Sequence, residues 1–205
     1  YLGAMGATFP KQNNIISFCC GVLGHPGGGF RLHHYSKGQV CEISQVATCN
    51  TIFKKELFDK VGLFDLGNKY GSEDSELCLR VIEKIGKNQF LYIPQALVWH
   101  YSPDNIFKFM KWYIRRGKAD CELLLKHRIH LKYFIETSFV LKVAVVVLLS
   151  LLVSFKIFLG CFLLWCIVQL VRNSFMFKYF TYYKFSKIER IYIFLTFPFL
   201  SLIHI

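Results

Sequence analysis

The chain has 205 residues, a formal net charge of +12 and 54 % hydrophobic residues. The charge suits nucleic acid, an anionic membrane face or phosphorylated substrates, but the sequence contains no recognised nucleic-acid-binding motif. Residues up to about Arg128 have ordinary α/β composition, whereas the chain is almost continuously apolar after Lys132. A nucleic-acid binder has no use for that apolar part, so the composition favours a domain followed by a membrane region.

The eight cysteines form no metal-binding pattern. Cys19 and Cys20 are adjacent, and no C-x-x-C occurs in the chain. Cys161 and Cys166 lie in apolar sequence, where a thiol behaves as a small hydrophobe. These features indicate reduced, structural cysteines in a cytoplasmic domain.

The first predicted elements are short. The Gly-rich stretch over residues 24–34, GHPGGGFRLHH, is expected to be a flexible loop, because it lacks the G-K-S/T of a phosphate loop. Residues 45–53 predict a short strand or loop. The stretch KKELFDKV, residues 54–61, predicts a short helix with its apolar side chains on one face, and a loop at residues 62–65 follows.

An acid-rich helix is predicted next. Ser72 is expected to be its N-cap, and Gly86 suits its C-terminal end. Apolar residues recur between them at helical spacing, and Glu73, Asp74 and Glu76 occupy the first turn.

Two short strands and a long helix complete this part of the chain. The strands are expected at residues 89–93 and 96–99, separated by Pro94 and leading to His100. Residues 108–126 predict an amphipathic, aromatic-rich helix with a cationic side, which suits a membrane interface.

The apolar region is expected to form a helical hairpin at about residues 139–171. One continuous helix there would be about 50 Å long, against ~30 Å for the hydrocarbon core. Basic residues flank the region on both sides, and both flanks favour the cytoplasmic face, which an even number of crossings satisfies. Residues 191–205 would begin a third span. The alternatives are one long span or a long buried helix of a soluble protein.

The acid cluster is unusual in a chain with 25 Lys and Arg against 13 Asp and Glu. The helix dipole favours acids in a first turn by about 0.3–1 kcal/mol each, so helix capping alone explains many such clusters. Three linked strings point further: ATCNTIFKKELFDKVGLFD, YGSEDSELCLRVIEKIG and YIPQALVWH. The first is similar to the Asn segment, aromatic helix and G-G-F-D turn of family 2 glycosyltransferases, with Leu63 in place of the second Gly. The second and third are similar to that family's G-x-E-D-x-D-L-x-x-R helix, with Glu76 in place of Asp, and Y-x-P-x-A-x-V-x-H strands.

Over about residues 40–130 the chain thus resembles the acceptor-side half of these membrane-associated enzymes. The resemblance implies an α/β fold: a partial GT-A domain at residues 1–130, without its N-terminal donor half, and transmembrane α-helices at residues 131–205. It also implies a multi-pass protein of the cell membrane with a cytoplasmic catalytic domain. The activity implied is inverting transfer of a sugar from a nucleotide-sugar donor to a lipid-linked or polysaccharide acceptor.

The resemblance also implies residue roles. Asp74 would be the general base that takes the proton of the acceptor hydroxyl, and Glu73 would orient the acceptor or hold Asp74 in place. Asn50 and Asp65 are candidates to bind sugar hydroxyls, and an Asx-type turn is the alternative for each. His100 is a candidate metal ligand, with a plain structural role as the alternative.

Three arginines complete the candidates. Arg115 and Arg116 suit a diphosphate on the donor or on a lipid-linked acceptor, and attraction to anionic lipid is the alternative. Arg80 lies six residues after Asp74 and is expected to form a structural ion pair.

The donor side is expected to lie outside this chain. The family binds the nucleotide and Mg²⁺ or Mn²⁺ through a D-x-D motif on an earlier strand, and this chain contains no D-x-D. The chain begins at Tyr1 without Met or an opening strand and ends inside an apolar run, so we expect a fragment. The rival hypothesis is a non-catalytic membrane-anchored adaptor whose acids only cap a helix.

We expect the purified chain alone to transfer no sugar, because the nucleotide-binding strands would lie upstream of it. The measurement is product formation from a panel of nucleotide sugars, with an upstream-extended protein as the control. Turnover by the chain alone would contradict the truncated interpretation. An upstream sequence without a D-x-D and a nucleotide-binding strand would favour the adaptor.

Overall fold

The structure is a computed structural model that describes residues 1–127, 145, 149–150, 152–203. The chain divides into two compact units, Tyr1–Leu131 and Lys132–Ile205. All eight cysteines lie among the described residues and are free thiols, as expected. Burial raises the pKa of the Cys78 thiol to about 12, which keeps it protonated at neutral pH.

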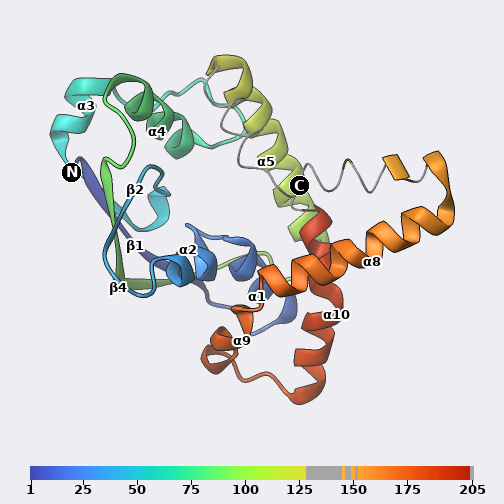
Figure 1. Ribbon diagram of the computed structural model, residues 1–205. Coiled ribbons are helices and arrows are strands. Elements are labelled where there is room, and N and C mark those ends of the chain that lie inside the picture. The colour runs from blue at the N-terminus through green and yellow to red at the C-terminus, as the bar shows by residue number, and fades with distance from the viewer. Residues whose placement is uncertain (128–144, 146–148, 151, 204–205) are drawn as a thin grey trace. The chain divides into compact units, whose positions relative to one another are not determined.

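The first unit has mixed α/β structure built on a four-stranded sheet, which confirms the predicted α/β class (Figure 1). The strand order is β2 (Cys41–Ile43), β4 (Phe90–His100), β1 (Gly3–Pro10), β3 (Thr51–Phe53). β1 pairs parallel with β4 and antiparallel with β3, while β2 pairs antiparallel with β4. The expectation that no strand opens the chain is wrong. β1 escapes detection because it is rich in small residues and lies inside the sheet, where polar alternation is lost.

β4 is one strand, whereas the sequence predicts two strands separated by Pro94. Pro94 has no N–H to donate to the ladder, and strands usually end or bulge at such a residue. Here the pairing with β1 shifts register between Gly6 and Thr8, so the strand bulges and continues to His100.

The Asn50 side chain supplies hydrogen bonds at this bulge. Its Nδ2 donates to the carbonyl of Ala7 at 2.9 Å and to the carbonyl of Ala96 at 2.8 Å. A Cβ at Gly6 would lie 2.1 Å from the Ala96 oxygen and 2.4 Å from Asn50 Nδ2, so only glycine leaves room for this arrangement.

Two helices follow β1 and contact it: α1 (Ile15–Leu23) and α2 (Gly29–Tyr35). The predicted flexible loop at residues 24–34 is therefore wrong, since only a short Gly-rich turn separates these helices. Phe30 explains why this stretch has regular structure, because the side chain is fully buried and its ring centroid lies 4.8 Å from that of Phe9.

The other predicted helices of this unit are confirmed: α3 (Lys55–Val61), α4 (Glu73–Lys84) and α5 (Ile106–Lys126). α3 and α4 contact each other. Gly86, just beyond α4, has φ +125°, a value that suits glycine. Asn105 caps α5 by accepting a hydrogen bond from Lys108 N at 2.9 Å.

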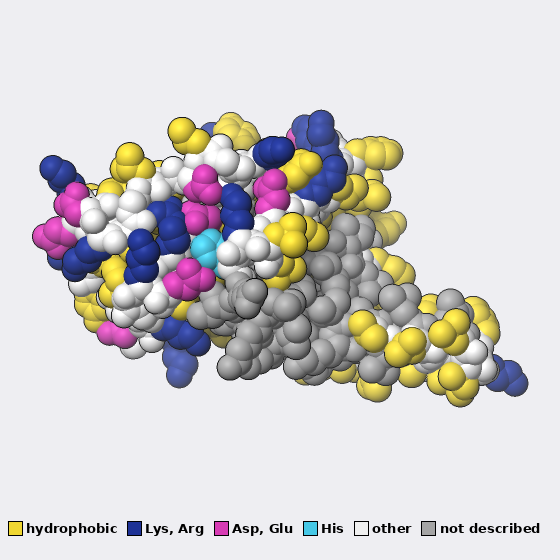
Figure 2. Space-filling model, turned by 90° about the horizontal axis from the view of Figure 1, so that it is seen from above, with side chains coloured by type: hydrophobic (Ala, Val, Ile, Leu, Met, Phe, Trp, Pro, Cys, Tyr) yellow, Lys and Arg dark blue, Asp and Glu magenta, His cyan; other side chains and the backbone are white. Residues whose placement is uncertain are grey.

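The second unit contains α8 (Phe155–Arg172), α9 (Met176–Tyr179) and α10 (Lys187–Ile203). Among the described residues, α8 is the helix long and apolar enough to cross a membrane. Large hydrophobic side chains are exposed along it (Figure 2). Most of the first arm of the predicted hairpin at 139–171 lies outside the described residues. α10 contains the start of the expected third span and carries Pro198 in its interior.

Replacing Asn50 by Ala should lower the free energy of unfolding by about 1–3 kcal/mol, because the carbonyls of Ala7 and Ala96 lose their donor. Urea denaturation measures this difference. Asn13→Ala is the control, since Asn13 is exposed and outside the regular elements. Equal stability of the two variants would show that Asn50 does not hold the bulge.

Candidate functional site

The loop between α3 and α4 is held by a buried ion pair. Arg80 Nε donates to both carboxylate oxygens of Glu76 at 2.9 Å, and Glu76 is only 4 % exposed. Arg80 Nη1 donates to the Val61 carbonyl, and Arg80 Nη2 donates to the Leu63 carbonyl at 2.8 Å. His127 lies 3.2 Å from the same Glu76 carboxylate. The predicted structural ion pair of Arg80 is thereby confirmed, and it fixes the start of the loop to α4.

Three cations of α5 hold the rest of this loop. They reach different points along it: Lys126 Nζ donates to Asp65 Oδ2 (2.8 Å) and Asn68 Oδ1 (2.6 Å), Arg115 Nη1 to the Tyr70 carbonyl (3.1 Å), and Arg116 Nη1 to Ser72 Oγ (3.0 Å). Several of the basic residues of α5 therefore bond to the loop. The spacing of these residues in the sequence does not reveal these contacts.

Asp65 forms the Asx-type turn that was the alternative to sugar binding. Its Oδ1 accepts a hydrogen bond from Gly67 N at 2.7 Å, and its Oδ2 pairs with Lys126. The hydrogen bond from Lys126, followed by that from Gly67, lowers the pKa of the Asp65 carboxyl below its usual value. Both oxygens of Asp65 are thus engaged within the loop.

The backbone turns sharply just before the acid cluster. Gly71 has φ +87° and Ser72 has φ +70°, so two successive residues are left-handed. This conformation costs a non-glycine residue such as Ser72 about 1–2 kcal/mol. Ser72 occupies the N-cap position, but its side chain does not cap the helix as predicted. Its Oγ accepts a hydrogen bond from Arg116 instead, because the left-handed backbone differs from the extended geometry of a capping residue.

Asp74 is oriented by two backbone N–H groups. Its Oδ1 accepts from Ser75 N at 2.7 Å and its Oδ2 from Thr48 N at 3.3 Å, and the side chain is half-buried. Thr48 begins the short 3₁₀ helix η1 (Thr48–Asn50), so the structure brings Asp74 beside the segment that ends at Asn50. The amide hydrogens of Asn50 are engaged with the sheet, whereas its Oδ1 has no hydrogen-bond partner among the described residues.

Positive charge and a second carboxylate accompany Asp74. Arg116 Nη2 lies 3.3 Å from Ser75 Oγ, and Arg116 also pairs with Asp120 at 3.3 Å. Glu73 is half-buried and makes no hydrogen bond or ion pair within the part of the chain that the structure describes. The first turn of α4 thus presents an oriented carboxylate, a neighbouring carboxylate without a partner and a nearby guanidinium.

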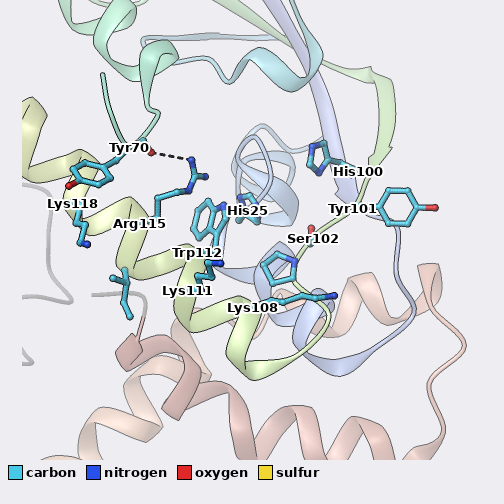
Figure 3. A pocket seen from close by; sticks show the side chains of 12 residues that line it. His25, Tyr70, His100, Tyr101, Ser102, Lys108, Lys111, Trp112, Arg115 and Lys118 are labelled. Carbon is cyan, nitrogen blue, oxygen red and sulfur yellow. Dashed lines mark hydrogen bonds between the residues drawn. The ribbon is translucent and has the colours of Figure 1, made fainter. Parts of the chain in front are cut away.

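A cavity of about 670 Å³ lies along α5 (Figure 3). Arg115 and His100 line it, whereas Asp74, Glu73, Asn50, Asp65 and Arg116 are outside its lining. Its wall includes Tyr70, which leads into the left-handed turn before α4. The structure therefore places the predicted residues in two groups: one around the start of α4 and one in the cavity.

His100 is at the end of β4, and its buried Nδ1 has no hydrogen-bond partner among the described residues. A metal site needs several ligands of this kind. The residues that the structure describes contain no group of three His, Cys, Asp or Glu side chains able to hold an ion. His100 alone does not make a metal site.

Several residues of the cavity are not among the candidates predicted from the sequence. Trp112 lies against His25, with ring centroids 4.0 Å apart, and His25 belongs to the stretch assigned to a flexible loop. Lys111 and Lys118 also line the cavity. Their three- and four-residue spacing from Arg115 is a helical signal that was available in the sequence.

Acidification should release the loop at Asp65. The pKa of the Asp65 carboxyl is lower in the folded loop than its ordinary value. The ionised carboxylate therefore stabilises the folded loop at pH values above the ordinary pKa, and this stabilisation is lost as the pH falls through the folded-state pKa. Hydrogen exchange at Gly67, corrected for intrinsic rates, should therefore be slow at pH 6 and accelerate below about pH 4.

Asp65→Ala should exchange rapidly at both pH values, because alanine offers Gly67 N no acceptor, while Asp59→Ala, an exposed change on α3, should match the parent protein. Slow exchange in Asp65→Ala at pH 6 would contradict the tether.

No protein-family model matches the chain, and no curated protein matches it either. The assignment of a function accordingly depends on the sequence motifs and on the geometry described above.

Proposed function

We propose that the chain is part of an inverting glycosyltransferase in which Asp74 is the general base. The acceptor hydroxyl attacks the anomeric carbon of a nucleotide sugar, the bond to the nucleoside diphosphate breaks, and Asp74 takes the hydroxyl proton. The observation that carries this proposal is the fixed orientation of Asp74 by Ser75 N and Thr48 N. A base must be held within hydrogen-bond reach of the proton that it removes, and two backbone N–H groups on regular elements give such positioning.

The backbone before Asp74 supports the same proposal. Left-handed residues other than glycine persist where the surroundings enforce them, and they cluster at functional sites. Ser72 is such a residue, and Arg115 and Arg116 hold the turn around it. An acid cluster that only caps a helix has no need of this strained turn, because an ordinary extended N-cap serves that purpose at lower cost.

The neighbouring residues take different roles in this proposal. Glu73 orients the acceptor, since its carboxylate is half-buried without a partner among the described residues. Asn50 contacts a sugar hydroxyl through Oδ1, because its Nδ2 serves the sheet. Asp65 is a positioning residue that acts through the loop, and Arg116 places a positive charge next to Asp74.

The protein would be a multi-pass enzyme of the cell membrane with its catalytic unit in the cytoplasm. α8 supports membrane insertion by its length and exposed apolar surface, and basic residues flank the apolar region. The domain would be the acceptor-side part of a GT-A fold. A donor half outside this chain would bind the nucleotide and Mg²⁺ or Mn²⁺, and the metal, when bound, would stabilise charge on the leaving diphosphate.

Asp74→Asn in the complete enzyme should lower kcat about 10²–10⁴-fold, because the base is removed while the shape is kept. Nucleotide-sugar affinity, measured by titration calorimetry, should remain near that of the parent protein. Asp59→Asn on α3 is the matched control and should retain full activity.

Near-normal turnover of Asp74→Asn would show that Asp74 is not the base. Absence of sugar transfer by the complete protein itself would favour the adaptor instead.

A further inference from the structure

One face of α5 carries a row of cations along the cavity. The row consists of residues spaced three, four and three apart: Lys108, Lys111, Arg115 and Lys118. This spacing places all four on one side of the helix. The adjacent side packs into the unit through three buried residues: Phe109, Ala119 and Leu123. The buried side fixes the rotation of α5, so the cations are presented to the cavity by the fold (Figure 3).

Three of these cations have no acidic partner among the residues that the structure describes. Lys108 pairs with Asp104 at 2.8 Å. For Lys111, Arg115 and Lys118, no carboxylate lies within 4.0 Å among the described residues. Three positive charges on one wall raise the local concentration of an anion.

The rest of the cavity wall is mainly aromatic, with Ile114, Pro103 and Ser102 beside the rings. Trp112 and His25 form a ring pair at its centre, and Ile114, exposed at 59 %, extends the apolar surface. Among the described residues that line the cavity, none is Asp, Glu, Asn or Gln. Among the described lining residues, no carboxylate is therefore present to repel a phosphate.

We propose that this cavity binds the diphosphate of an amphiphilic ligand. Lys111, Arg115 and Lys118 contact the phosphates, and the adjoining apolar chain lies against Trp112 and Ile114. Residues 111 and 118 are about 10 Å apart along the helix, which lets their long side chains converge on two linked phosphates. A volume of about 670 Å³ is also in the range of cavities that enclose a ligand head group.

Arg115 connects this cavity to the candidate catalytic residues. It lines the cavity and donates to the Tyr70 carbonyl, while the next residue, Arg116, donates to Ser72 beside the acid cluster. The identification of the ligand as the sugar acceptor rests on the proposed function: its diphosphate lies at α5 and its attached sugar reaches Asp74. Binding of the diphosphate amphiphile itself does not depend on catalysis.

The test is equilibrium binding of radiolabelled geranylgeranyl diphosphate to the full chain in nanodiscs of zwitterionic lipid. We expect saturable binding, competition by inorganic pyrophosphate that is at least about tenfold weaker, and no competition by geranylgeraniol. Lys111→Gln/Lys118→Gln should weaken binding by about tenfold or more, because two charge-assisted hydrogen bonds are lost.

Lys55→Gln/Lys60→Gln on α3 is the matched control, because it removes the same net charge from exposed positions. Equal weakening in the two double variants would overturn the proposal, as would binding that geranylgeraniol displaces. Competition by phosphatidylglycerol nanodiscs as strong as that by unlabelled probe would instead identify an ordinary lipid headgroup site and also overturn it.

Asp74→Asn separates this inference from the proposed function. It should keep full affinity for the probe while sugar transfer by the complete enzyme is lost. If Asp74→Asn binds the probe and transfers sugar normally, only the role of Asp74 is refuted. If Asp74→Asn loses transfer but the parent chain does not bind the probe, only the diphosphate site is refuted.

Discussion

The buried ion pair between Glu76 and Arg80 is the interaction on which the candidate site depends. One guanidinium holds a carboxylate of α4, the carbonyl of Val61 at the end of α3 and the carbonyl of Leu63 in the loop, so it ties the loop to both helices. Removing one partner of such a pair leaves a buried charge and costs about 3–5 kcal/mol. The loop in turn sets the left-handed turn at Ser72, and this turn directs Asp74 to Thr48. The position of Asp74, the proposed base, thus depends on the ion pair of Glu76, which lies two residues further along α4.

The basic residues of α5 divide into two sets with different physical roles. Arg116 and Lys126 bond to the loop and are partly neutralised by acids. Lys111 and Lys118 face the cavity without carboxylate partners among the described residues. Arg115 belongs to both sets. The net charge of the protein therefore overstates the positive charge available to a ligand, because some of the basic residues hold the loop and only the others face the cavity.

The proposed chemistry follows from this division. The first turn of α4 offers carboxylates that can take a proton, and the cavity offers cations and apolar surface that can hold a phosphorylated amphiphile. The loop between them keeps the two groups of residues in a constant relation within the first unit. Membrane attachment through an apolar helix such as α8 would bring such a ligand to the protein from the bilayer, where its chain resides.

The sequence by itself determined the α/β class, the helices α3, α4 and α5, the acid cluster and the Arg80 ion pair, because helical periodicity and short spacings express local contacts. It did not reveal β1, whose small buried residues lack alternation, or the continuity of β4. That continuity needs Asn50, a residue 46 positions away from Ala96 along the chain. The cavity and the partners of the α5 cations were likewise decided only by the tertiary structure. Hydrogen bonds between segments far apart in the chain leave no periodic trace in the sequence, so only folding shows which donor meets which acceptor.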